Sequence, residues 1–312
     1  MELSPRQALS GVWVDTLTPL QSDLRADADR LYAHLRNLSA RGAHRFVLFG
    51  HAGEGASFST EEKLAVLQAV LEHGMEPENL MLGVQTSSLT EAAAIVKKAC
   101  ALQVRRFLVT PPAYYVNTSG SGVRDYFAHL LQSVPHTDWQ LMIHQTGQMS
   151  KAGDLPDASI AELVQAYPET LVGIVDQDPR VDHTLALMRS FGKRLSVSTS
   201  HEPNLTQIKP SGCISAYANL LPKTVAHIVA QDTSTQGHQV PGLKVRTPDE
   251  RVLELQKIQA DFGMIQTFKL FLSTYYRVAD WERVRPPLSP VGADRRENLL
   301  KAFKSFNLLA SE

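Results

Sequence analysis

Three histidines stand at the ends of short apolar stretches of the chain. His51 follows RFVLFG, His144 ends WQLMIH, and His201 follows LSVSTS. Imidazole titrates near neutral pH and is also a common metal ligand, so it suits either proton transfer or metal binding. The three residues lack a close-spaced partner such as His-x-His. Their spacing therefore favours acid–base chemistry, and a metal site built from all three is the weaker alternative.

The stretch LVGIVDQDPR (171–180) changes from apolar to polar within a few residues. It reads as a buried strand that surfaces after Val175, at Asp176. The reactive side chain of many enzymes stands at such a strand end. Valine, however, has no nucleophile and no titratable group, so Val175 cannot perform covalent chemistry.

Short apolar runs rich in Val, Ile, Leu and Phe recur along the chain, and they predict strands that are buried on both faces. The predicted strands are 11–19, 45–50, 80–85, 106–111, 139–144, 171–175, 195–200 and 213–218.

Helical patterns with recognisable starts lie between these runs. Asp27 opens an amphipathic segment. Ser59 with Glu62, and Ser88 with Glu91, have the spacing of a capping box, in which each side chain bonds the other residue's backbone N–H.

Eight alternating units of this kind predict a (β/α)₈ TIM barrel with a C-terminal helical extension. We assign residues 1–220 to the barrel core, and residues 221–312 to the last barrel helix and the extension. A doubly wound sheet is the competing fold, but the glycine-rich phosphate turn that it usually offers is absent. In a barrel, functional residues lie at the C-terminal ends of the strands.

Composition narrows the class of function. The 312 residues are 43% hydrophobic and 20% charged, with a net charge of -1, so nothing favours nucleic acid or a membrane as partner. The N-terminal residues lack the pattern of a secretion signal. Cys100 and Cys213 have neither the number nor the spacing of a disulfide framework or a zinc site. We expect a cytoplasmic protein without a metal or other cofactor.

Several motifs resemble one known family. The stretches FGHAGEGASFSTEEK, VTPPAYYVNTSGSGVRDYF and GCISAYANLLPK are similar to motifs of the class I aldolases that include dihydrodipicolinate synthase and N-acetylneuraminate lyase. That family forms a Schiff base with a keto acid through a strand-six lysine, in the context Gly-Ile-Lys-Asp. Here the context reads Gly173-Ile174-Val175-Asp176. The resemblance implies that Val175 replaces the lysine.

The resemblance also assigns places in the family's proton relay. His51 stands where the family has the first threonine of a pair, and Ala52 where it has the second. His144 takes the place of the strand-five tyrosine, and Tyr115 that of the tyrosine that reaches the neighbouring subunit's site. Gln148 takes the place of a carboxylate-binding arginine. We therefore expect His51 and His144 to act as acid and base near neutral pH, assisted by Tyr115.

The expected ligand is a small carboxylate or keto acid, and the family implies a homodimer or homotetramer. Backbone N–H groups of the turn after strand two are expected to cradle the ligand's carboxylate. Glu54 in that turn is expected to be structural, and Glu202 to cap the helix that follows it. The predicted substrate-binding residues are Ala52, Gly53, Gln148, Val175, His201 and Ile214.

Four functions remain open. The leading one is an enzyme that acts on this ligand without covalent attachment. The others are a ligand-binding pseudoenzyme, a scaffold with a plugged mouth, and a true aldolase with a relocated lysine. Lys151 is the first candidate for that lysine, followed by Lys209 and Lys223.

Overall fold

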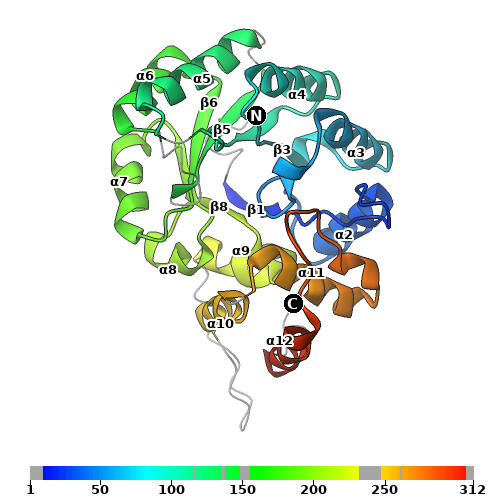
Figure 1. Ribbon diagram of the computed structural model, residues 1–312. Helices are drawn as coiled ribbons and strands as arrows, with labels where there is room; N and C mark the ends of the chain where they lie inside the picture. Colours follow the sequence, from blue (N-terminus) through cyan, green and yellow to red (C-terminus); the bar gives the residue numbers. More distant parts are fainter. Residues whose placement is uncertain are drawn as a thin grey trace.

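Eight parallel strands form a closed barrel in sequence order, with β8 paired to β1 (Figure 1). The computed structural model describes residues 10–115, 117–134, 138–147, 155–231, 247–260 and 262–306. The strands are β1 (Gly11–Asp15), β2 (Phe46–Leu48), β3 (Leu80–Val84), β4 (Arg106–Val109), β5 (Gln140–Gln145), β6 (Leu171–Asp176), β7 (Ser196–Thr199) and β8 (Gly212–Ser215). The predicted TIM barrel is confirmed.

Helices surround the barrel, and a further group lies on one side of that ring (Figure 1). The ring consists of α2 (Ala28–Ala40), α3 (Thr60–Glu72), α4 (Leu89–Ala101), α5 (Gly120–Ser133), α6 (Asp157–Ala166), α7 (Val181–Phe191), α8 (Leu205–Ile208) and α9 (Pro222–Ala230). The C-terminal group consists of α10 (Pro248–Ala260), α11 (Met264–Tyr276) and α12 (Ala293–Phe306). Short 3₁₀ turns are η1 (Gly55–Ser57), η2 (Pro77–Asn79), η4 (Glu202–Asn204), η5 (Tyr217–Asn219) and η7 (Ala279–Glu282). Within the described residues, no helix has the length and apolar character needed to cross a membrane.

The helix starts follow the sequence signals with one difference. Ser59 accepts from the backbone N–H of Glu62, whose carboxylate accepts from the backbone N–H of Ser59, so this capping box is complete. Ser88 also caps α4 by accepting from the backbone N–H of Glu91. The Glu91 carboxylate accepts instead from the hydroxyl of Thr60 on α3. The second predicted box is therefore wrong in its return bond, because a neighbouring helix offers that carboxylate a donor.

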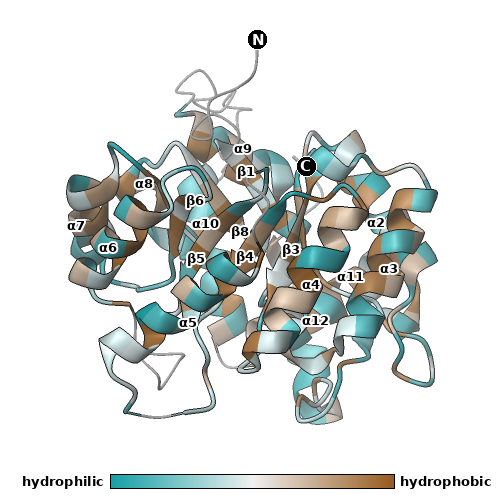
Figure 2. Cartoon of the chain, turned by 90° about the horizontal axis from the view of Figure 1, so that it is seen from above, coloured by the Kyte–Doolittle hydropathy of each residue, from teal (hydrophilic) through white to brown (hydrophobic). Residues whose placement is uncertain are grey.

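The barrel interior is filled by a separate apolar cluster. It consists of Trp13, Val47, Met81, Leu108, Met142, Val172, Val175 and Ile214. A larger cluster packs the outer faces of the strands against the helices, whose exposed sides are hydrophilic (Figure 2). Since the inner cluster closes the barrel below its mouth, a ligand can reach only the layer above it.

A buried ion pair joins the C-terminal helices to the turn after β2. Glu54 has a left-handed backbone (φ 56°), and its carboxylate accepts from Lys269 of α11 and from the backbone N–H of Arg285 at 2.8 Å. Lys269 also donates to the carbonyl of Arg283 at 2.7 Å. Both charged side chains are fully buried. Glu54 has the structural part predicted for it.

We expect Lys269→Met to lower the free energy of unfolding by about 3–5 kcal/mol, because it leaves the Glu54 carboxylate buried without its cation. Urea unfolding followed by tryptophan fluorescence measures the change. The matched control is Lys301→Met, which removes a cation from the exposed pair with Glu297 on α12. Equal midpoints for the two variants would contradict the account of this pair.

Candidate functional site

The end of strand six provides an apolar floor and a structural anchor. Val175 is fully buried in the inner cluster and lies in register beside His144 of β5. The next residue, Asp176, accepts from the hydroxyl of Thr184 at 2.6 Å and contacts Nδ1 of His183 at 3.0 Å, both on α7. Asp176 therefore fixes the start of α7, and neither residue is among those that line the two cavities described below.

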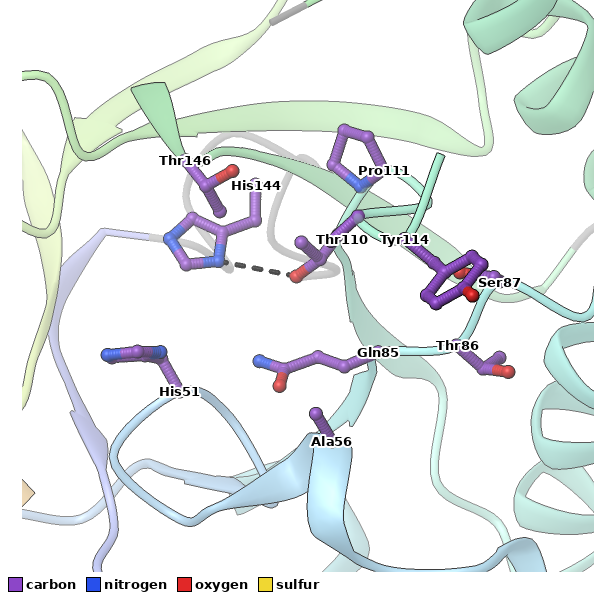
Figure 3. A pocket seen from close by; sticks show the side chains of 11 residues that line it. His51, Ala56, Gln85, Thr86, Ser87, Thr110, Pro111, Tyr114, His144 and Thr146 are labelled. Atoms are coloured by element: carbon purple, nitrogen blue, oxygen red, sulfur yellow. Dashed lines mark hydrogen bonds between the residues drawn. The ribbon is translucent and has the colours of Figure 1, made fainter. Parts of the chain in front are cut away.

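A cavity of about 540 Å³ opens above this floor, on the side of β3 and β4. Figure 3 shows His51, Gln85 and His144 directed toward a shared space. Gln85 and Thr110 also line it, so its wall includes residues with neutral hydrogen-bonding groups. We call it the first cavity.

A second cavity of about 450 Å³ lies toward the C-terminal helices. It is also lined by His51 and His144, together with side chains from the ends of β1, β7 and β8 and from α10 and α11. The two histidines therefore lie between the cavities and are accessible from both.

Burial keeps His144 neutral. Its Nδ1 lies 3.5 Å from the Thr110 hydroxyl and its Nε2 lies 3.4 Å from the Ser200 hydroxyl, both long for hydrogen bonds. Burial, with a smaller contribution from nearby His51, lowers the pKa of His144 to about 3. Burial also lowers the pKa of His51. The prediction that His144 titrates near neutral pH is therefore wrong, because desolvation outweighs the hydrogen bonds that would stabilise its charge.

Asp15, at the end of β1, is a site residue that the sequence reasoning did not single out. Its Oδ2 accepts from the backbone N–H of Ala52 at 2.9 Å. The carboxylate lies against Gly50, where a Cβ atom would overlap Oδ1. Glycine at residue 50 is therefore required by this contact. Its place as a charged residue at the end of a barrel strand is the signal that could have identified Asp15.

Glu202 extends across to strand eight. Its Oε1 accepts from the Ser215 hydroxyl at 2.8 Å and from the backbone N–H of Tyr217 at 3.1 Å. Glu202 is also the acidic residue in the first turn of η4, the helical turn that leads into α8. Glu202 therefore stands at the helix start as predicted, and its carboxylate additionally joins that start to the β8 loop.

Among the site residues described above, Asp15 and Glu202 carry the carboxyl groups whose charge changes near neutral pH. Burial raises the pKa of Asp15 to about 7, against the lowering effect of the Ala52 hydrogen bond, and the charge of Glu202 raises it further. Burial likewise raises the pKa of Glu202 to about 7. Near neutral pH, the carboxyl groups of Asp15 and Glu202 can therefore gain or lose a proton, whereas the imidazoles of His51 and His144 are neutral.

Of the other predicted substrate-binding residues, some line a cavity and some do not. His201 and Ile214 line the second cavity. Ala52 and Gly53 line neither, and the Ala52 N–H that was expected to receive a ligand carboxylate is bonded to Asp15. That part of the predicted cradle is wrong, because the chain supplies its own carboxylate.

Tyr115 lines neither of the two cavities. Its side chain is 60% exposed, whereas neighbouring Tyr114 lines the first cavity. Its predicted part in a partner's site stays a prediction. Gln148 and Lys151 lie outside the described residues.

Lys209 and Lys223 are exposed, and among described residues no lysine lines either cavity. The described part of the chain also contains no group of three or more His, Cys, Asp or Glu side chains arranged to hold a metal ion.

The barrel, the turn after β2 and the motifs at the strand ends define a family of barrel proteins. The chain belongs to the dihydrodipicolinate synthetase family, whose model matches residues 8–306. It is 26% identical over 246 residues to an uncharacterized DapA-like lyase of Chloroflexus aurantiacus, covering 78% of this chain and 79% of that one.

A further relative and a solved structure are similar to this chain over most of its length. A 2-dehydro-3-deoxy-phosphogluconate/2-dehydro-3-deoxy-6-phosphogalactonate aldolase of Saccharolobus solfataricus is 24% identical over 288 residues, covering 91% of this chain and 92% of that one. The crystal structure of dihydrodipicolinate synthase from Agrobacterium tumefaciens has the same fold, with a TM-score of 0.84, 24% identity, and coverage of 95% of this chain and 99% of that chain.

The raised pKa values predict how stability depends on pH. The folded state holds protons on Asp15 and Glu202 that the unfolded chain releases above about pH 4. Their contribution to the free energy of unfolding therefore falls as pH rises from about 4 to about 7, and stays low above that. Asn at residue 15 cannot ionise, so the Asp15→Asn variant no longer releases this proton on unfolding. We expect the stability of the variant relative to the parent to increase over this range, on the order of a few kcal/mol.

Urea unfolding at several pH values between about 4 and 8 measures this difference. Asp294→Asn, on the exposed start of α12, is the matched control and should give a profile parallel to the parent's. A parallel profile for Asp15→Asn would show that Asp15 is ionised in the folded protein throughout the range.

Proposed function

We propose that this protein is an enzyme that acts on a small carboxylate or 2-keto acid without attaching it covalently, with His51 and His144 as its acid and base. The observation that carries the proposal is the shared wall of the two cavities. Two neutral imidazoles face the ligand space, while Val175, which the family resemblance assigns to the Schiff-base lysine, belongs to the apolar floor.

Neutral imidazoles suit the removal of a proton from the carbon next to a ketone. A ring nitrogen of His51 accepts that proton, while His144, which burial keeps neutral, donates a hydrogen bond to the carbonyl oxygen, where negative charge develops. Gln85 and Thr110, which line the first cavity, supply donors for the ligand's carboxylate. The relatives named as a lyase and an aldolase support chemistry of this kind.

We further propose that the protein is a cytoplasmic homodimer or homotetramer in which Tyr115 contributes to a neighbouring site. Tyr114 and Tyr115 are two of the large apolar side chains that are exposed in the single chain, at 82% and 60%. Their rings contact each other edge to face, with centroids 5.4 Å apart. The buried, unpaired state of both cysteines fits a reducing compartment.

A pseudoenzyme that binds the ligand without reaction is the second candidate. The observation that favours it is the Asp15 carboxylate on the Ala52 N–H, because a ligand carboxylate cannot use that donor while Asp15 holds it.

Proton exchange with solvent separates these candidates. In heavy water, we expect the protein to replace the C3 protons of pyruvate or of another 2-keto acid in a small panel with deuterium, followed by proton NMR. His51→Ala and His144→Ala should each slow exchange by about 100-fold or more, the scale of general acid–base catalysis.

His44→Ala is the matched control, because His44 is exposed in the loop before β2 and remote from both cavities. Saturable binding without exchange identifies the pseudoenzyme. Exchange that persists in both site variants contradicts the assignment of His51 and His144.

A further inference from the structure

We propose that the second cavity receives the distal part of the keto acid and selects an uncharged one, so that the substrate is a 2-keto acid longer than pyruvate that ends in a neutral group. The inference rests on the proposed function for the place of the keto acid group at the two histidines. What it adds is the class of substrate.

The two cavities share the imidazoles as a common wall. His51 and His144 line both of them, whereas Gln85 and Thr110 line the first. A keto acid whose carboxylate lies in the first cavity and whose carbonyl faces the imidazoles can extend its remaining carbons into the second. That space, of about 450 Å³, is in the size range of pockets that enclose whole small-molecule ligands. Pyruvate has a single carbon beyond its carbonyl and would leave the second cavity unfilled.

Apolar side chains form one part of the wall of the second cavity. Ala216 directly after β8, Met264 at the start of α11, and Leu288 line it and are partly exposed. All three pack against the large core cluster behind them. Covering such apolar surface with the carbons of a ligand is favourable. This part of the wall therefore favours a ligand with a hydrocarbon chain.

Amide groups form another part of the wall. The glutamines that line the cavity are partly exposed, and they are Gln177, Gln256, Gln259 and Gln266. Gln259 donates to the hydroxyl of Tyr217 at 2.8 Å, which holds its amide in place. An amide offers hydrogen-bond donors and an acceptor without a net charge. Neutral polar groups on the ligand's chain are therefore accommodated here.

The ionisable side chains of this wall supply no positive charge near neutral pH. Among the described residues that line the cavity they are Asp15, His51, His144, His201, Glu202 and Tyr217. Burial lowers the pKa of all three histidines, so these side chains are neutral. The two acids are hydrogen-bonded within the chain, Asp15 to the N–H of Ala52 and Glu202 to the hydroxyl of Ser215.

A terminal carboxylate or phosphate is disfavoured in such a place. It would lose its hydration without gaining a cation from these side chains, and an ionised acid of the wall would repel it. A mismatch of this kind rejects a wrong ligand as effectively as good contacts select the right one. The wall thus discriminates by the charge at the far end of the keto acid.

Three keto acids test the inference by isothermal titration calorimetry. The compounds 2-ketopentanoate and 2-ketoglutarate have the same carbon chain and differ in a terminal methyl or carboxylate group, and pyruvate lacks the distal part. We expect 2-ketopentanoate to bind about tenfold or more tightly than pyruvate, the scale of burying two more carbons. We also expect it to bind at least about tenfold more tightly than 2-ketoglutarate.

Gln256→Lys on α10 places a cation at the second cavity. It should lower the ratio of the Kd of 2-ketoglutarate to that of 2-ketopentanoate by about tenfold or more. Gln68→Lys, on the exposed side of α3, is the matched control and should leave the ratio unchanged. Near-ultraviolet circular dichroism checks that each variant is folded, and Gln266→Lys makes the same test from α11.

Equal or tighter binding of 2-ketoglutarate than of 2-ketopentanoate by the parent protein would overturn the proposal, and so would equal binding of pyruvate. A ratio that the two cavity variants leave unchanged would overturn the placement of the distal part. These comparisons measure binding, so they are separate from the exchange of C3 protons. Selective binding without exchange would contradict the proposed enzyme and support the ligand class, and exchange without selectivity would do the reverse.

Discussion

The turn that carries His51 depends on one buried carboxylate. Glu54 adopts a left-handed backbone and accepts from Lys269 and from the backbone of Arg285, so the turn after β2 is fastened to the C-terminal extension. Removing either charge would leave the other one buried without a partner, which is costly, so the turn and the extension must be held together. Because the same turn passes under Asp15 at Gly50 and Ala52, the ion pair also fixes the acid that faces the second cavity.

Above the apolar floor, the site depends on a competition between burial and hydrogen bonding. Burial disfavours every charge, so it lowers the pKa of His144 and raises the pKa of Asp15 and Glu202. The outcome is a mouth whose ionisable groups are largely uncharged near neutral pH. Such a layer can exchange protons with a ligand, and no lysine is among the described residues that line it.

The fold could be predicted from the sequence because its signal is repeated eight times, whereas the site could be predicted only in part. The strand ends and the family motifs predicted that His51 and His144 lie close together, and both histidines line the two cavities. The sequence patterns did not predict that the Ala52 N–H donates to Asp15, or that Glu202 accepts from Ser215 of strand eight. Each of these contacts joins residues from different segments of the chain. The neutral state of His144 depends on how deeply the folded barrel buries it, which no local pattern encodes.

The central claim is that Val175 closes the covalent route of the family. Borohydride reduction in the presence of pyruvate and a small panel of keto acids, read by intact mass, tests it most directly. Val175→Lys, which places an amine at the position that the family resemblance assigns to the lysine, is the matched positive control. Our account predicts no keto-acid adduct on the parent protein and an adduct on the Val175→Lys variant. An adduct on the parent, mapped by peptide mass to any lysine, would contradict it and would establish a relocated Schiff-base residue.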